Sequence, residues 1–350
     1  MVLGGTVHRP HGVPENSGTV RNDKARMHDR ARRVFAFLDE LISALPVPSN
    51  YRKLLQVQVG QTDSWQRPET LAAQLPLLVH EAVTGDERPA LPVAGACTLL
   101  YLGADLFDSI TDHELPPTWR ARGSAEPNLT ATTLLAALPH LSIARLQEQG
   151  TTQAKLWALA HIFADTLLTM SAGQYEDLLF PNLESVSLDD CLVMVERKSG
   201  AAVGLLARAG AVLATEDAFT IEAYAAFGSC LGIAKQLMND VGGIWGDGVS
   251  RDLSNGKRTL PILHALATLR GEQRERLQRL LVAARESSEP HDEVRALLAA
   301  AGSVRYTALI VWLYQEQARS HLAAASPKEL AARELRMLLD LASLLSQPEE

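Results

Sequence analysis

The chain has 350 residues, of which 47% are hydrophobic and 21% charged, and its formal net charge is −8. This composition is typical of a globular protein with a sizeable core, and the negative charge argues against a nucleic-acid partner. No apolar run approaches the roughly 20 residues that a membrane-spanning helix needs, and no signal-peptide pattern is present near the N-terminus. We therefore expect a cytoplasmic protein without stable membrane insertion, whose three cysteines are buried and reduced.

Residues 1–22 contain Gly, Pro, His and Asn without periodicity, and we expect a mobile tail there. Residues 23–350 are predicted to form a single all-α domain, because apolar residues recur at helical spacing and no segment alternates convincingly with period two. The first helix is predicted over 26–45. Another begins near Pro68, since proline suits the first turn of a helix.

The segment 91–112 is also predicted to be helical, and it carries a column of acids. Asp105, Asp108 and Asp112 stand at i, i+3 and i+7, so the three carboxylates share one face of an otherwise apolar helix. Mutual repulsion and desolvation would penalise this arrangement unless positive charge lies against it. A hard divalent cation such as Mg²⁺, which binds carboxylates together with phosphate oxygens, meets this need.

Residues 113–128 are predicted to form a loop beside the acidic column. The loop is either a surface connection or a flap that orders over a bound diphosphate, with Arg120 or Arg122 reaching in. Three further helices follow. The third of them, over 189–213, carries Lys198 at the start of a stretch of apolar and small residues.

A second set of oxygen ligands lies on the predicted helix 221–245 and just after it. Asn239 and Asp247 share a helical face, because eight residues are close to two turns, and Asp240 lies beside them. Basic residues follow directly. Two acidic helices followed by cations suit a diphosphate held between metal ions and Lys or Arg side chains. These basic residues are Arg251, Lys257 and Arg258.

Several segments, taken in order, resemble the isoprenyl diphosphate synthase superfamily. FDSITD (107–112) and QLMND with SRDLSNGKRTLPILHAL (236–266) resemble its two aspartate-rich regions, and GQYEDL (173–178) resembles its Gly-Gln-x-x-Asp helix. RKSGAAVGLLARAGAVLA (197–214) resembles the helix of its diphosphate-binding lysine, and FGSCLGIAKQ (227–236) leads into the second region as in the family. The resemblance implies an all-α, single-domain helical bundle around a deep central apolar cavity. It also implies Mg²⁺ as cofactor, with three ions expected.

The resemblance assigns a role to each candidate residue. The expected metal ligands are Asp108, Asp112, Asn239 and Asp247, with Asp240 as a further catalytic acid. The expected diphosphate-binding residues are Lys198, Arg251, Lys257 and Arg258. Asp105 and Gln236 are expected to support the ligands. The expected tail pocket comprises Leu100, Tyr101, Gly103, Ala104, Phe107 and Gln174.

The sequence also departs from the family's pattern. Ser109, Asn239 and Gly243 replace aspartates of the two Asp-Asp-x-x-Asp motifs. The Gly-Lys-x-x-Arg loop that holds isopentenyl diphosphate is absent near residues 50–70, and so are the paired arginines after the first motif. The chain thus resembles the terpene cyclases of this fold, which keep only the metal-bound allylic site. The spacing Asn239-x-x-x-Gly243-x-x-x-Asp247 agrees with their Asn-x-x-x-Ser-x-x-x-Glu motif.

We accordingly expect a Mg²⁺-dependent terpene cyclase that ionises an allylic prenyl diphosphate. The C20 substrate geranylgeranyl diphosphate is favoured over C15 farnesyl diphosphate, because Gly103 and Ala104 are small and leave the floor of the tail pocket open. The alternatives are a prenyltransferase, either a prenyl diphosphate synthase or a peptide prenylase, and a catalytically inactive regulatory subunit of a prenyl synthase. A homodimer is left open.

Overall fold

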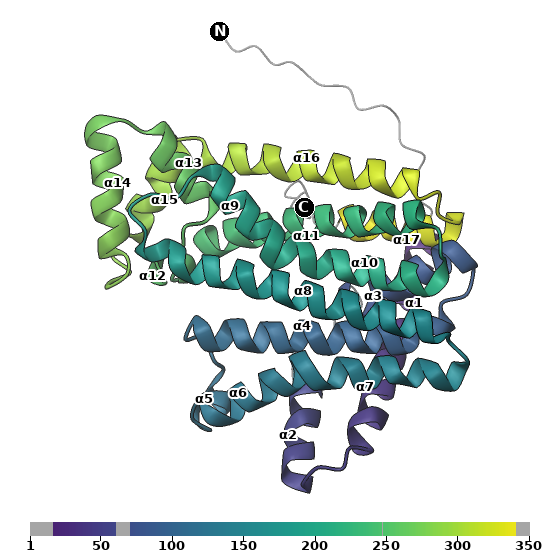
Figure 1. Ribbon diagram of the computed structural model, residues 1–350. Helices are drawn as coiled ribbons and strands as arrows, with labels where there is room; N and C mark the ends of the chain where they lie inside the picture. The colour runs from purple at the N-terminus through teal and green to yellow at the C-terminus, as the bar shows by residue number, and fades with distance from the viewer. Residues whose placement is uncertain (1–16, 61–70, 247, 341–350) are drawn as a thin grey trace.

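The computed structural model describes residues 17–60, 71–246 and 248–340, and within these ranges every regular element is helical, as predicted (Figure 1). The α-helices in chain order are α1 (Ser17–Ser43), α2 (Ser49–Gly60), α3 (Leu71–Thr84), α4 (Leu91–Thr111), α5 (Pro117–Arg120), α6 (Ala125–Thr132), α7 (Leu138–Ala144), α8 (Gln153–Leu179), α9 (Leu188–Val195), α10 (Ala201–Ala214), α11 (Ala218–Trp245), α12 (Arg251–Ser254), α13 (Leu260–Thr268), α14 (Gly271–Ala283), α15 (His291–Ala300), α16 (Ser303–Ala324) and α17 (Glu329–Asp340). The short turns between them are the 3₁₀ turns η2 (Arg88–Ala90), η4 (Arg145–Gln149) and η5 (Phe180–Asn182) and the π-helical turns η3 (Thr133–Ala137) and η6 (Glu196–Gly200).

The main bundle is built around α10, which packs against α3, α8 and α11, while α4 packs against α3 and α7 (Figure 1). Small residues allow the backbones to approach closely. A Cβ at Gly210 would lie 2.5 Å from the carbonyl oxygen of Pro76 in α3, and one at Gly228 would lie 2.6 Å from that of Val203 in α10. Because interiors are close-packed, these contacts fix the spacing of the helices that carry the functional residues.

Three helices end at the same end of the bundle. The C-terminal ends of α4, α8 and α11 all lie near α12, at the left of Figure 1. The carbonyl ends of helices carry a partial negative charge, and the two acidic motifs and the Gly-Gln-x-x-Asp segment occupy these same ends. The fold therefore concentrates negative charge at one end of the molecule.

The helix boundaries follow the prediction closely, with a few differences. The first acidic helix is α4, which ends one residue before Asp112, and the helix of Asp240 is α11. Helix α1 begins at Ser17, inside the segment expected as a tail; residues 1–16 lie outside the described ranges. The periodicity of residues 49–60, the helix α2, was too weak to predict a helix. The expected loop 113–128 contains the short helix α5.

Within the described residues, two helical stretches have the length and composition of a membrane span, contrary to the expectation from the sequence. They are Arg88–Thr111, with 24 residues, and Ala125–Gln149, with 25; the bent pair His291–Ala300 and Ser303–Ala324 adds a third if it counts as one span. Within the structure, 72% of the apolar window of the first and 44% of that of the second are buried. Burial of the first stretch is expected, because a helix in the middle of a bundle, such as α4, is apolar on nearly all sides.

The N-terminal and C-terminal helices are joined by a buried ionic network. Arg30 on α1 is only 1% exposed and its guanidinium contacts Glu81 on α3 at 2.8 Å, and also Glu87 and Glu334. Glu334 on α17 is completely buried. Removing one partner of a buried pair costs about 3–5 kcal/mol, because the other charge is left uncompensated.

Candidate active site

Two lysines bridge the acids at the ends of α4 and α8. The Nζ atom of Lys198 lies 2.8 Å from a carboxylate oxygen of Asp108 and 2.7 Å from one of Asp177. The Nζ atom of Lys257 lies 2.6 Å from Asp112 and 3.5 Å from Asp177. The structure thus brings together four of the predicted site residues, and it adds Asp177 of the GQYEDL segment, which had not been assigned a role.

The position of Lys198 depends on close packing of α8 against η6. A Cβ at Gly173 would come within 2.5 Å of the backbone nitrogen of Lys198, so only glycine permits this approach. Lys198 lies within the π-helical turn η6, a type of distortion that is frequent at functional sites. One residue after Gly173, Gln174 donates to Asp108 at 3.0 Å. Gln174 was expected in the tail pocket, but the structure places it on the carboxylate.

The lysines and acids stabilise each other's charged forms. Burial alone would raise the pKa of Asp108, but Lys198 and Lys257 outweigh it and hold the pKa below its usual value. Burial would lower the pKa of both lysines, yet the nearby aspartates raise it. Burial raises the pKa of Asp112, against the effect of Lys257. Asp108 is 38% exposed although protein surrounds it, so solvent reaches the cluster.

Asp240 of the second motif is 7% exposed, and burial, with the charge of Asp252 next in effect, raises its pKa to about 7. The side-chain amide of Gln236 donates to Asp240 at 2.8 Å, and the carbonyl oxygen of Gln236 accepts from Ser199 at 2.9 Å. Gln236 therefore orients Asp240, and its supporting role in the reaction stays a prediction.

Asp252 on α12 lies against Gly243, one of the positions where the sequence departs from the family's second motif. A Cβ at Gly243 would lie 2.3 Å from a carboxylate oxygen of Asp252, so this carboxylate occupies the space where the missing side chain would begin. Burial raises the pKa of Asp252 to about 6, against the charge of Lys257. The sequence prediction missed Asp252, although it lies within the quoted segment SRDLSNGKRTL. Its only signal was that likeness, because proximity to Gly243 depends on the path of the chain after α11.

The donor set of this end of the bundle fits Mg²⁺. Its five carboxylates outnumber the two ammonium groups, and all its ligand atoms are oxygens, which Mg²⁺ prefers. Among the described residues, no three His, Cys, Asp or Glu side chains converge on one point as a preformed metal site; instead the lysines lie between the acids. The carboxylates are Asp108, Asp112, Asp177, Asp240 and Asp252.

Asn239, Arg251 and Arg258 do not join this cluster. Asn239 is exposed and makes no side-chain hydrogen bond to the acids within the described residues, and Asp247 lies outside the described residues. Arg251 pairs with Glu114 at 3.2 Å and is 77% exposed, at the rim. Arg258 lies beside Arg285, whose charge together with burial lowers its pKa. Lys257 is thus the basic residue after α11 that enters the cluster.

The residues expected to line the tail pocket divide into two groups. Leu100 is 2% exposed in the core, and a Cβ at Gly103 would lie 2.7 Å from Leu135, so helix packing requires Gly103 to be small. Tyr101 and Ala104 are half-buried and Phe107 is 38% exposed. The Nζ atom of Lys235 lies 6.0 Å from the Tyr101 ring. Burial lowers the pKa of Lys235, and burial together with Asp108 raises that of Asp105. Lys235 was not predicted.

The segment 113–128 is held in place at two points. Glu114 at its start pairs with Arg251 at the rim of the site, and Trp119, which is 5% exposed, donates its indole N–H to Gln58 of α2 at 2.9 Å. Arg120 donates to the carbonyl of Leu115, and Arg122 pairs with Glu126. Both arginines thus have partners within the segment itself, which favours the reading of a surface connection.

A helical bundle that gathers two acidic motifs and two lysines at one end has the architecture of the isoprenyl synthase fold. The chain belongs to the polyprenyl synthetase family, whose pattern matches residues 117–300. Farnesyl diphosphate synthase of Mycobacterium tuberculosis is 28% identical over 268 residues, covering 70% of this chain and 73% of that protein. Geranylgeranyl diphosphate synthase of the same organism is 31% identical over 196 residues, covering 53% and 55%.

Solved structures confirm the fold. A polyprenyl synthetase of Streptomyces coelicolor superposes with a TM-score of 0.78 at 24% identity, covering 91% of this chain and 99% of that one. The two curated relatives named above are prenyl diphosphate synthases. This favours the prenyltransferase alternative over the terpene cyclase that the missing basic loop had led us to expect.

Proposed function

We propose that the protein is a Mg²⁺-dependent prenyltransferase, which ionises an allylic prenyl diphosphate and transfers the prenyl group to a second substrate. The observation that carries the proposal is the cluster in which Lys198 and Lys257 bridge Asp108, Asp112 and Asp177. Acids alone would repel a diphosphate, and lysines alone would not require a metal. Both together suit a site for a metal–diphosphate complex.

The lysines act on the leaving group. The pKa of each is raised, so both remain charged at neutral pH and can donate N–H bonds to diphosphate oxygens. The C–O bond of the allylic ester breaks heterolytically and its electron pair stays on the diphosphate; preorganised donors stabilise this developing charge. The carbon of the prenyl cation then bonds to an electron-rich atom of the acceptor, which loses a proton. Mg²⁺, held by the carboxylates named above, would supply Lewis acidity at the diphosphate.

The acceptor and the chain length are finer points of the proposal. Chain elongation with isopentenyl diphosphate is the form of transfer that the relatives' names support, although the missing basic loop predicts weak affinity for this acceptor. We retain the preference for a C20 allylic substrate over C15. This preference now rests on Ala104, since Gly103 serves helix packing. Ala104→Phe should suppress turnover of the C20 substrate more than that of the C15 one, and equal losses would contradict the assignment.

One experiment separates the candidate reactions. Purified protein is incubated with C10, C15 or C20 allylic diphosphates and Mg²⁺, with and without isopentenyl diphosphate, and the products are analysed by mass spectrometry. A longer diphosphate supports the proposal. A hydrocarbon or terpene alcohol formed without acceptor would instead establish the cyclase. EDTA and Asp108→Ala should abolish either reaction. Full turnover after chelation would overturn the metal mechanism.

A further inference from the structure

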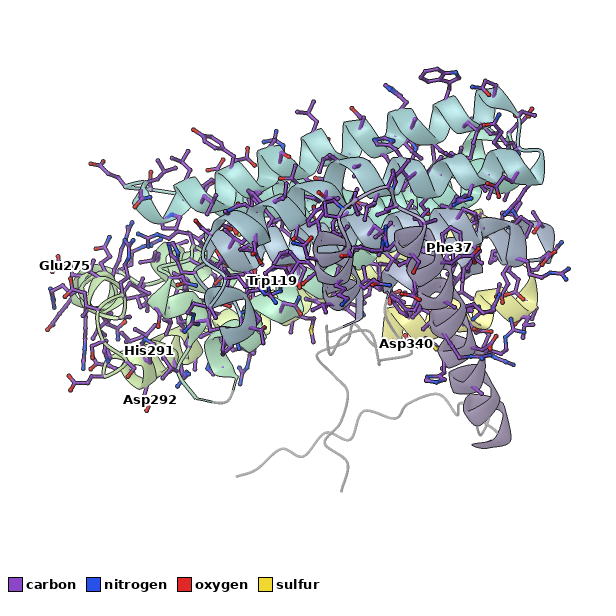
Figure 2. All side chains as sticks on the ribbon, turned by 90° about the horizontal axis from the view of Figure 1, so that it is seen from below. Phe37, Trp119, Glu275, His291, Asp292 and Asp340 are labelled. Carbon is purple, nitrogen blue, oxygen red and sulfur yellow. The ribbon has the colours of Figure 1, made fainter. Side chains whose placement is uncertain are left out.

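A cavity of about 500 Å³ lies at the α14 end of the molecule. Figure 2 labels Glu275 of α14 and His291 of α15 at this end, far from Asp340 of α17. The cavity lies between residues 181–188, the connection from α12 to α13, and α14. Its lining is largely apolar. The apolar lining residues include Val186, Leu188, Ile262, Leu263, Leu266 and Leu281.

Three arginines line the same cavity: Arg258, Arg274 and Arg285. Arg285 lies against the turn at Gly256, where φ is +67°. A Cβ on residue 256 would lie 2.8 Å from the Nε atom of Arg285. Burial and the charge of Arg285 lower the pKa of the half-buried Arg258, so these two guanidinium groups are close enough to repel each other.

In the described part of the chain, none of the three guanidinium groups makes a hydrogen bond or an ion pair with another side chain. The acids of the lining are Glu184, which is exposed and forms no ion pair with the described residues, and Asp252, which lies against Gly243 near the active-site cluster. A cationic cavity is unexpected on a chain whose net charge is −8. Like charges brought together without a counter-ion indicate a place where an anion is bound, because an Arg pair matches the oxygens of phosphate.

We propose that this cavity binds a phosphate or diphosphate ester of an apolar alcohol. The headgroup lies between Arg258 and Arg285, and the apolar chain lies over the leucine-lined wall. This inference does not depend on the reaction proposed above. The cavity is nevertheless next to the active site, because Lys257 precedes Arg258 and also lines it. The residues from Gly256 to Arg258 form a wall common to both sites.

The test is isothermal titration of the full chain with dodecyl phosphate in EDTA, which suppresses metal-dependent binding in the active site. The wild type should bind one equivalent, and Arg258→Gln and Arg285→Gln should each weaken binding about tenfold or more. Arg276→Gln is the matched control: Arg276 lies on α14, as Arg274 does, but it pairs with Glu293 at 2.5 Å, and its replacement should change affinity less than twofold. Lys198→Gln should also bind like the wild type.

Further arms define the ligand. Inorganic phosphate should bind at least tenfold more weakly than dodecyl phosphate, since it lacks the chain. Leu266→Trp fills the cavity and keeps the arginines. This variant should bind dodecyl phosphate no more tightly than inorganic phosphate. Farnesyl monophosphate distinguishes the source: tighter binding than dodecyl phosphate indicates an isoprenoid ligand, and equal binding indicates any lipid phosphate. Wild-type affinity in Arg258→Gln and Arg285→Gln, or a loss confined to Lys198→Gln, would overturn the proposal.

Discussion

Lys198 contacts acids from two helices, so its charge is central to the cluster. Replacing it by glutamine removes a donor that is aimed at the leaving group, and we expect kcat to fall by about 10²–10³-fold. Steady-state kinetics with the allylic substrate identified above measure the effect.

Lys155→Gln provides the control for this substitution. The Nζ atom of Lys155 donates to the carbonyl of Leu213 at 2.8 Å, and Lys155 lies at the opposite end of α8 from the contact with Lys198. This variant should keep wild-type turnover. If Lys198→Gln also stays within threefold of wild type, Lys198 does not contact the leaving group.

Asp240 should make stability depend on pH. Burial raises its pKa from 3.8 to about 7, so the folded state holds a proton that the unfolded state releases above about pH 4. Over this window the unfolded state binds fewer protons, and the free energy of unfolding therefore falls as pH rises from about 4 to about 7 and levels off above that. Asp240→Asn should remove much of the fall, as measured by Tm at pH 5, 6, 7 and 8.

The matched control for this measurement is Asp165→Asn, an exposed position on α8. The dependence of its Tm on pH should follow that of the wild type. Both should include a smaller decline in Tm due to Asp252, whose pKa is also raised, to about 6. Parallel profiles for wild type and Asp240→Asn would show that Asp240 is ionised throughout.

At the scale of elements, the contact between α8 and η6 depends on the missing side chain of Gly173. Gly173→Ala would force the Cβ into the backbone at Lys198, and we expect a loss of about 1–3 kcal/mol in the free energy of unfolding. Gly242→Ala is the opposite case, because no atom lies within 4 Å of its Cβ position. It should stabilise α11 by up to about 1 kcal/mol. Urea denaturation of both variants tests this, and equal signs would contradict it.

The connection from α12 to α13 shows where prediction from sequence ends. Lys257 and Arg258 are adjacent and both basic, and the resemblance assigned them the same diphosphate-binding role. The turn at Gly256 sends Lys257 to Asp112 and Arg258 to Arg285. The different contacts of Lys257 and Arg258 depend on the backbone conformation at Gly256 and on helices far away in the chain. Neither can be predicted from the periodicity of the sequence.

At the scale of the molecule, α8 presents an exposed apolar face. Trp157, Leu168 and Tyr175 are 69%, 71% and 67% exposed, and spacings of 11 and 7 residues place them on one side of the helix. A face of this kind indicates a protein–protein contact, and we expect a homodimer. Leu168→Glu should yield a monomer in light scattering after size exclusion.

The control for the dimer is Phe219→Glu, at a position that is 66% exposed at the start of another helix, α11. It should leave the molar mass unchanged. A wild-type protein that elutes as a monomer at micromolar concentration would contradict the assignment.

Most of the architecture could be predicted, because helices are recognised from the local spacing of apolar residues. The core of each acidic motif also lies within or at the end of one helix. Lys198 and Lys257 were found through the resemblance of their segments to the family's motifs. Asp177, Asp252 and Lys235 were not assigned, since their roles arise only when α8, α12 and α11 approach other helices. Packing between distant segments decides these roles.

The network around Arg30 has a consequence for how the chain is made. Its contact with Glu334 joins residues 304 positions apart, whereas Glu81 and Glu87 are translated soon after Arg30. On a ribosome, α1 and α3 can therefore associate early, but the surface that α17 covers stays open until almost the whole protein has emerged. Long-range contacts of this kind form late. The nascent bundle would thus be a natural client for chaperones until translation is nearly finished.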